Sequence, residues 1–129
     1  MKRLLCLLAA GIPVFGTELP PCLSQGTLVS SEMAAGEVGE GVQVLDLRPK
    51  ADWDKGHLPK SKQLTLADEN FTEKVKAMMD PAKPLLIYCR SGRCSPKAAK
   101  LLREAGFSHV DELEGGMDAW EQAGRPVER

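Results

Sequence analysis

A short apolar run, followed by a loop and a well-marked helix, is the feature that most constrains the fold of this chain. The run Leu85–Tyr88 is unbroken, which is typical of a central parallel strand buried on both faces. A helix is predicted from Pro96 to Ala105. Ser95 is a good N-cap residue, proline suits the first helical position, and Gly106 suits the position after the helix end. A strand, loop and helix in this order predict a unit of an α/β fold.

The rest of the chain repeats the alternation of strands and helices. Apolar runs predict strands at residues 42–47, 63–66 and 109–113, and helical spacing or capping predicts helices at residues 32–37, 71–79 and 117–122. This order predicts an α/β fold with a mostly parallel sheet. A length of 129 residues suits one small domain.

Composition excludes several classes of protein. The net charge of −1 and the 43% hydrophobic content are those of a globular chain, not a disordered one. Without a basic excess, no nucleic-acid partner is expected. The 4 cysteines are too few for a disulfide-rich miniature protein, and their spacing is not that of a zinc finger or ribbon.

The N-terminus has the pattern of a secretory signal peptide. Lys2 and Arg3 precede an apolar run from Leu4 to Phe15. The run is shorter than the roughly 20 residues of a transmembrane helix, so no stable membrane insertion is expected after cleavage. We predict a signal peptide over residues 1–16, cleaved after Gly16, and a periplasmic or secreted protein. The alternative is a buried N-terminal helix.

Residues 17–27 are rich in proline and polar residues, which predicts a linker or loosely attached arm before a domain at residues 28–129. Cys22 follows Pro21, which disfavours lipid attachment at this cysteine. Cys6 leaves with the signal peptide, and the odd number of cysteines that remains suggests a free thiol.

The loop between the central strand and its helix carries the predicted chemistry. Gly92 allows the loop to curl into an anion-binding nest of N–H groups beside a helix N-terminus. Cys89 lies at the base of this nest, and Arg90 and Arg93 add positive charge that favours a nucleophilic thiolate. The expected chemistry is therefore attack by sulfur on an electrophile carried by an anion.

Three interpretations of this cysteine are open. A phosphatase loop ends in an arginine that clamps the phosphate, and Ser95 stands at that position here, which argues against phosphoryl chemistry. Transfer of a sulfane sulfur suits the shorter loop. A buried structural cysteine at a strand end is the third interpretation.

Three stretches resemble the rhodanese-like sulfurtransferases over roughly residues 28–127. They are VLDLRPKADWDKGHLPKS (44–61), LLIYCRSGRCS (85–95) and LEGGMDAWEQAGRPV (113–127). The resemblance implies a three-layer fold with a mainly parallel five-stranded sheet flanked by helices. It implies that Cys89 forms a persulfide, and that the remaining loop residues bind the sulfur and the anionic donor: Arg90, Ser91, Gly92, Arg93, Cys94 and Ser95. A single domain with an export signal is similar to the periplasmic members of the family.

The expected function is transfer of a sulfane sulfur from a small anionic donor such as thiosulfate to a thiol or cyanide acceptor. No metal or organic cofactor is expected. One alternative is a sulfur carrier or binding module for a protein partner, and another is a thiol redox protein that uses Cys89 and Cys94. Cys94 is either a small side chain that fits the loop or a resolving thiol that forms a disulfide with Cys89. A metal site from both cysteines and a histidine lacks an evident fourth ligand.

Other residues of the three stretches have structural interpretations. We expect Asp46 and Arg48 to bind each other or the backbone and His57 to be a satisfied structural histidine. Trp53 and Trp120 are expected to contribute packing.

Overall fold

The computed structural model describes residues 26–129, so the predicted signal peptide and most of the predicted arm lie outside the described residues. The elements follow one another along the chain as β1 (Leu28–Val29), α2 (Ser31–Gly39), β2 (Gln43–Asp46), α3 (Lys50–Lys55), β3 (Lys62–Gln63), α4 (Phe71–Met78), β4 (Leu85–Tyr88), α5 (Ser95–Glu104), β5 (Val110–Leu113) and α6 (Gly116–Gln122). Within residues 26–129, no helix combines the length and the apolar character that a membrane span requires.

The strands form one five-stranded sheet in the order β1-β5-β4-β2-β3, and each neighbouring pair is parallel. The prediction of an α/β fold with a five-stranded parallel sheet is confirmed. Strand β4 is central, with Tyr88 opposite Asp46 of β2. The amide of Leu47 donates to the carbonyl of Tyr88 at 2.8 Å, so the segments that follow β2 and β4 leave the sheet side by side.

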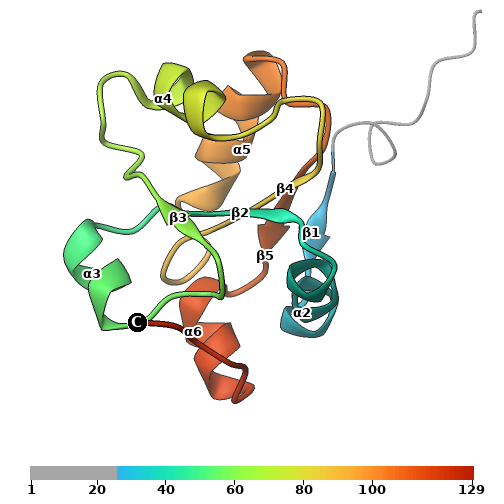
Figure 1. The fold of residues 1–129 in the computed structure, drawn as a ribbon, viewed down its shortest axis with the longest axis vertical. Helices are drawn as coiled ribbons and strands as arrows, with labels where there is room; N and C mark the ends of the chain where they lie inside the picture. The colour runs from blue at the N-terminus through green and yellow to red at the C-terminus, as the bar shows by residue number, and fades with distance from the viewer. Residues whose placement is uncertain (1–25) are drawn as a thin grey trace, which may run out of the picture.

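Helices cover both faces of the sheet (Figure 1). α4 and α5 pack on one face, and α2 and α6 pack on the other. Leu85 and Ile87 of β4 face the first pair of helices, whereas Leu86 and Tyr88 face the second. Both faces of β4 are buried, which explains why its sequence is apolar without alternation. Cys89 continues the alternation and belongs to the face covered by α4 and α5.

The start of α5 differs from the sequence prediction. Cys94, not Ser95, is the N-cap residue, and its side chain makes no capping hydrogen bond. The Ser95 hydroxyl is buried and lies 3.3 Å from both the Gly92 carbonyl oxygen and Oε1 of Glu112. The prediction that Ser95 caps the helix was wrong because this hydroxyl has partners in the loop and on β5. The predicted helix end is confirmed, since Gly106 follows the C-cap residue with φ +108°.

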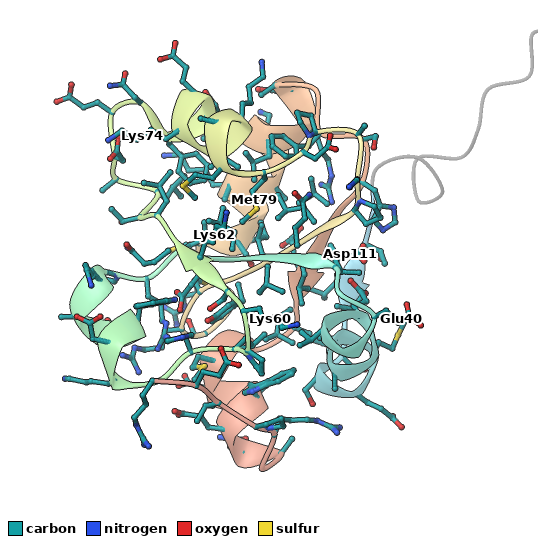
Figure 2. All side chains as sticks on the ribbon, in the orientation of Figure 1. Glu40, Lys60, Lys62, Lys74, Met79 and Asp111 are labelled. Atoms are coloured by element: carbon teal, nitrogen blue, oxygen red, sulfur yellow. The ribbon has the colours of Figure 1, made fainter. Side chains whose placement is uncertain are left out.

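An acidic pair, Glu37 and Asp111, joins α2 to β5, and Asp111 is labelled in Figure 2. Burial, followed by a hydrogen bond with Asp111, raises the pKa of the Glu37 carboxyl to about 8. Asp111 also accepts a hydrogen bond from the amide of Thr27 at 2.8 Å and lies 3.0 Å from Nε2 of His109. A protonated Glu37 therefore helps to hold the edge of the sheet at neutral pH.

Candidate active site

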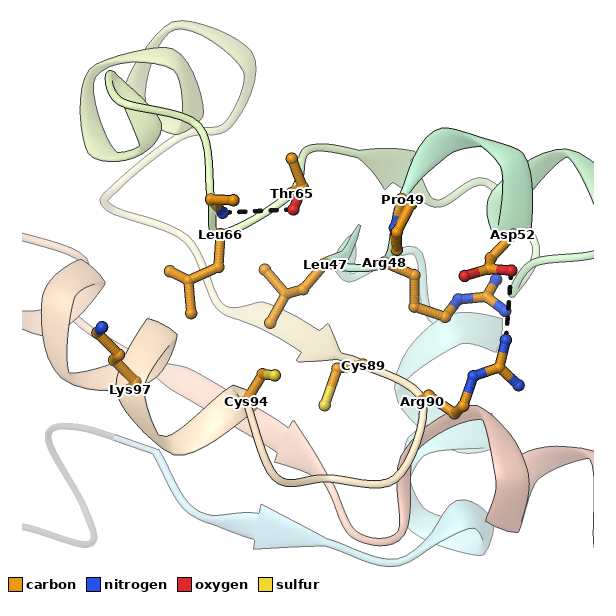
Figure 3. Close-up of a pocket in the computed structure, with 11 residues that line it drawn as sticks. Leu47, Arg48, Pro49, Asp52, Thr65, Leu66, Cys89, Arg90, Cys94 and Lys97 are labelled. Carbon is orange, nitrogen blue, oxygen red and sulfur yellow. Dashed lines mark hydrogen bonds and ion pairs between the residues drawn. The ribbon is translucent and has the colours of Figure 1, made fainter.

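A pocket of about 450 Å³ opens where β4 passes into the loop before α5 (Figure 3). The loop lies at the carboxyl end of a central parallel strand, which is the usual place for a ligand in an open α/β sheet. The pocket is lined by Leu47, Arg48, Pro49, Asp52, Thr65, Leu66, Ala67, Cys89, Arg90, Cys94 and Lys97. The wall opposite the loop is therefore built by segments that follow β2 and β3.

Cys89 contributes a buried thiol to this pocket. Its side chain is 5% exposed and packs with the core under α4 and α5, yet it also lines the pocket. Both described cysteines are free thiols, and Cys94 is exposed. The pocket is thus the side on which the otherwise buried Cys89 borders open space.

The backbone of the loop is fixed by the start of α6. The carbonyl oxygens of Cys89 and Arg90 accept hydrogen bonds from the amides of Met117 and Asp118, at 2.8 and 2.9 Å. None of the amides of residues 90–94 donates a hydrogen bond to another residue of the described chain. The carbonyl groups of Cys89 and Arg90 are thus occupied, whereas the N–H groups of residues 90–94 have no hydrogen-bond acceptor among the described residues and remain available to an anion.

Glycines make this close packing possible. Gly92 has φ +91°, and a Cβ at this position would lie 3.3 Å from the amide nitrogen of Gly115. Gly116 has φ +60°, and a Cβ there would overlap the carbonyl groups of Cys89 and Arg90. The Gly115–Gly116 pair of the sequence therefore serves as the support on which the loop rests.

The structure brings some of the predicted loop residues to the pocket and keeps others from it. Cys89, Arg90 and Cys94 line the pocket, whereas Ser91, Gly92 and Arg93 do not. Ser95 is buried beneath the loop and braces its backbone.

Some positively charged side chains at the pocket already form ion pairs with carboxylates of the described chain, and others do not. Arg90 lies 3.3 Å from Asp52 and 4.0 Å from Asp118, so carboxylates balance part of its charge. Lys97 also lines the pocket, and it forms no ion pair with any residue between 26 and 129. Sequence reasoning missed Lys97. Its position one helical turn after Cys94 is the signal that could have identified it.

Arg48 lines the pocket, but its positive charge is paired with a buried carboxylate. Its Nη2 atom lies 2.7 Å from Oδ2 of Asp46 and 2.7 Å from the carbonyl oxygen of Gly56. Burial alone would lower the pKa of Arg48, but the hydrogen bonds and ion pair with Asp46 raise it overall. The prediction that Asp46 and Arg48 bind each other is confirmed.

Tyr88 adds a hydrogen bond to the Asp46–Arg48 pair on the sheet face that α2 and α6 cover. Its hydroxyl donates to Asp46 at 2.6 Å and accepts from the amide of Leu58 at 3.1 Å. Burial, together with the Asp46 carboxylate, raises the pKa of the Tyr88 hydroxyl. Tyr88 is therefore a neutral hydrogen-bonding group that fixes the end of β4.

The predicted structural residues lie away from the pocket. His57 is 5% exposed, its Nδ1 lies 2.8 Å from the carbonyl oxygen of Trp53, and its ring stacks on the Trp53 ring at 3.8 Å. Trp120 is buried and donates to the carbonyl of Pro126 at 2.8 Å. These contacts agree with the structural interpretations of all three residues. In the described part of the chain, no cluster of three histidine, cysteine or acidic side chains could hold a metal ion.

Proteins with similar sequences and structures point to one family. The family described as Rhodanese-like domain matches residues 30–123. Thiosulfate sulfurtransferase GlpE of Shewanella oneidensis is 33% identical over 84 residues, which cover 65% of this chain and 80% of that protein. GlpE of Pseudoalteromonas translucida is 36% identical over 87 residues, covering 65% and 77%. The crystal structure of the Alr3790 protein from Anabaena is similar, with a TM-score of 0.70 and 25% identity over 78% of this chain and 81% of that one.

Proposed function

The chain belongs to the rhodanese-like domain family, and we propose that it is a sulfurtransferase that uses Cys89 to move a sulfane sulfur. The donor is a small anion such as thiosulfate, and the acceptor is a thiol or cyanide. The relatives named thiosulfate sulfurtransferase support this activity at the level of the family. The single observation that carries the proposal is a free, buried thiol at the base of a pocket, next to loop amides that have no partner within residues 26–129.

The first half of the reaction loads the cysteine. The Cys89 thiolate attacks the outer sulfur of thiosulfate, and a new bond forms between these two sulfur atoms. The bond between the outer sulfur and the sulfite sulfur breaks, and sulfite leaves with the electron pair. Cys89 is left as a persulfide, and sulfur transfer needs no separate oxidant or reductant.

The loop supplies electrostatic stabilisation for this step. The amides of Arg90 and Cys94, which line the pocket and donate to no residue between 26 and 129, and the N-terminal end of α5 present positive dipoles to the anion. Lys97 adds the charge at the pocket that no described carboxylate balances. These groups stabilise negative charge on the thiolate, the donor and the departing sulfite.

The second half of the reaction unloads the cysteine. A thiophilic acceptor attacks the outer sulfur of the persulfide, and the electron pair of the sulfur–sulfur bond returns to Cys89. Cyanide becomes thiocyanate, and a thiol becomes a persulfide. Because sulfite leaves before the acceptor reacts, the kinetics are expected to be ping-pong.

Mass measurement before and after thiosulfate treatment tests the proposal. The wild-type protein should gain one sulfur atom and lose it again on addition of cyanide. Cys89→Ser should gain no sulfur, and its turnover of thiosulfate and cyanide should disappear. A Cys89→Ser variant that still turns over at the wild-type rate would exclude Cys89 as the nucleophile.

We also propose that residues 1–16 direct export of the protein, on the basis of their charge and apolar pattern. Expression of the full chain in a bacterium should give a periplasmic or secreted protein that begins at Thr17. Replacing Leu7 with arginine interrupts the apolar run and should leave an unprocessed precursor in the cytoplasm. An unprocessed wild-type protein in the cytoplasm would contradict this assignment.

A further inference from the structure

We propose that Cys94 is a second sulfur carrier, which takes the sulfane sulfur from the Cys89 persulfide and presents it at the protein surface. The inference rests on the proposed function, because it needs sulfur to be loaded on Cys89 first. It adds a second covalent step to the reaction, and it gives the reaction an acceptor class that the pocket alone does not admit.

Two cysteines of opposite exposure share one pocket. Cys89 is 5% exposed and Cys94 is exposed, and both line the same cavity. Figure 3 shows both sulfur atoms beside the space between the end of β4 and the start of α5. Cys94 is the N-cap residue of α5, so the helix fixes its backbone beside the pocket. Its thiol has no hydrogen-bond partner among residues 26–129 and is free to react.

Burial decides which sulfur atom Cys94 can reach. The Sγ atom of Cys89 is packed with the core beneath α4 and α5, and its open side is the pocket. The outer sulfur of a persulfide on Cys89 therefore extends into the pocket, toward the wall that Cys94 helps to form. The outer sulfur is therefore the atom that is open to attack from the pocket side, where Cys94 lies.

The transfer is balanced without another reactant. The Cys94 thiolate forms a bond to the outer sulfur, the bond between that sulfur and Cys89 breaks, and the electron pair returns to Cys89. The proton of the persulfide stays on the transferred sulfur. Cys94 becomes the persulfide and Cys89 becomes the thiolate, so the overall oxidation state of sulfur does not change.

The relay matters for an acceptor that cannot enter the pocket. Cyanide is small enough to reach a sulfur on buried Cys89. A thiol on the surface of another protein approaches together with its own backbone, and it needs the sulfur at an exposed position. Cys94 supplies that position, so the relay identifies a protein thiol as the acceptor class.

The sequence allows the two sulfur positions to be separated. Trypsin cleaves after Lys76, Arg90, Arg93 and Lys97, so Cys89 and Cys94 fall on different peptides. The full chain is treated with thiosulfate, blocked with an alkylating reagent and digested without reductant, and the extra sulfur is located by mass spectrometry. In the wild type, both the peptide with Cys89 and the peptide with Cys94 should carry extra sulfur.

Two variants make the result specific. Cys94→Ser, which keeps a good N-cap residue and therefore the start of α5, should carry extra sulfur on Cys89 alone. Cys89→Ser should show complete loss of sulfur from the Cys94 peptide. The rate at which sulfur reaches Cys94 in the wild type should not change with protein concentration, because the transfer is intramolecular.

The other outcomes distinguish the relay from the proposed function. Extra sulfur on Cys89 alone in the wild type overturns the relay and leaves the sulfurtransferase in place. Extra sulfur on neither cysteine overturns both. Direct loading of Cys94 in Cys89→Ser, a rate proportional to protein concentration, or a Cys89–Cys94 disulfide with release of sulfide each overturns the relay.

Discussion

Gly116→Ala tests whether the start of α6 holds the active-site loop in place. A Cβ on Gly116 would lie 2.7 Å from the carbonyl carbon and oxygen of Arg90, and closer still to the carbonyl oxygen of Cys89. Non-bonded heavy atoms normally stay about 3.5 Å apart. The loop backbone must therefore move by about 1 Å or slightly more, and the contacted atoms are backbone atoms that cannot rotate away.

The expected effect has a stability component and an activity component. Alanine at φ +60° costs about 1 kcal/mol, and overpacking against fixed backbone costs about 1–3 kcal/mol more. The shift also disturbs the hydrogen bonds from the amides of Met117 and Asp118 to the loop carbonyls. A misplacement of about 1 Å at a reacting group can lower the rate about 100-fold. We expect a clearly destabilised protein with little sulfurtransferase activity.

The assay combines urea unfolding with turnover of thiosulfate and cyanide. Gly36→Ala in α2 is the matched control, because a Cβ at Gly36 has no neighbour within 4 Å. This control should gain up to about 1 kcal/mol in stability, since alanine favours the helix, and should keep its activity. A Gly116→Ala protein with the stability and turnover of the wild type would refute the proposed support of the loop.

Side-chain contacts of Glu37, Tyr88 and Lys97 can each be tested by one substitution. The pKa of Glu37 is raised from an ordinary 4.5 to about 8 in the folded chain. Between these pH values Glu37 keeps its proton in the folded chain and loses it in the unfolded chain. Stability should therefore fall as pH rises through this window, and Glu37→Gln should flatten the curve of urea unfolding free energy against pH. Tyr88→Phe removes the hydroxyl that contacts Asp46 at 2.6 Å and should lower the unfolding free energy by about 1–3 kcal/mol in the same assay. Lys97→Gln should lower kcat/KM for thiosulfate about fivefold at low salt and less at high salt, whereas Lys100→Gln, outside the pocket, should not.

The residues of the site that the sequence predicts are those that lie close together along the chain. The apolar run of β4, Cys89, the glycine-containing loop and the start of α5 lie within one short stretch of the sequence. Local rules for strands and helices place the thiol at a strand end and next to a helix N-terminus. These rules also predict both ends of the helix to within one residue, although they assign the wrong residue as the cap.

The remaining pocket wall could not be predicted because it depends on tertiary packing. Thr65, Leu66 and Ala67 follow β3, and the sequence does not show that this segment lies across the pocket from Cys89. Asp52 on α3 reaches Arg90 across the pocket mouth for the same reason. Such contacts join parts of the chain whose proximity is set by sheet order, not by local pattern.

The two-residue strand β1 was missed for a related reason. Leu28 and Val29 are too few to form a pattern with period two, and they belong to the sheet because β5 offers them a free edge. The amide of Glu112 on β5 donates to the carbonyl of Thr27 at 2.9 Å, which extends this pairing to the end of the predicted arm.

The pairing of Arg90 changes the account of how the site holds an anion. The sequence predicts that two arginine side chains supply the positive charge, but Arg90 faces Asp52 and Asp118, and Arg93 does not line the pocket. A charge shared with carboxylates attracts a small anion only weakly, whereas fixed amide dipoles act at short range without reorganising. We therefore expect the amides of Arg90 and Cys94, in a loop whose carbonyl groups bind α6, to contribute most to binding an anion. This is why we expect a substitution of Gly116, a glycine outside the loop, to affect the reaction more than removal of the Lys97 charge.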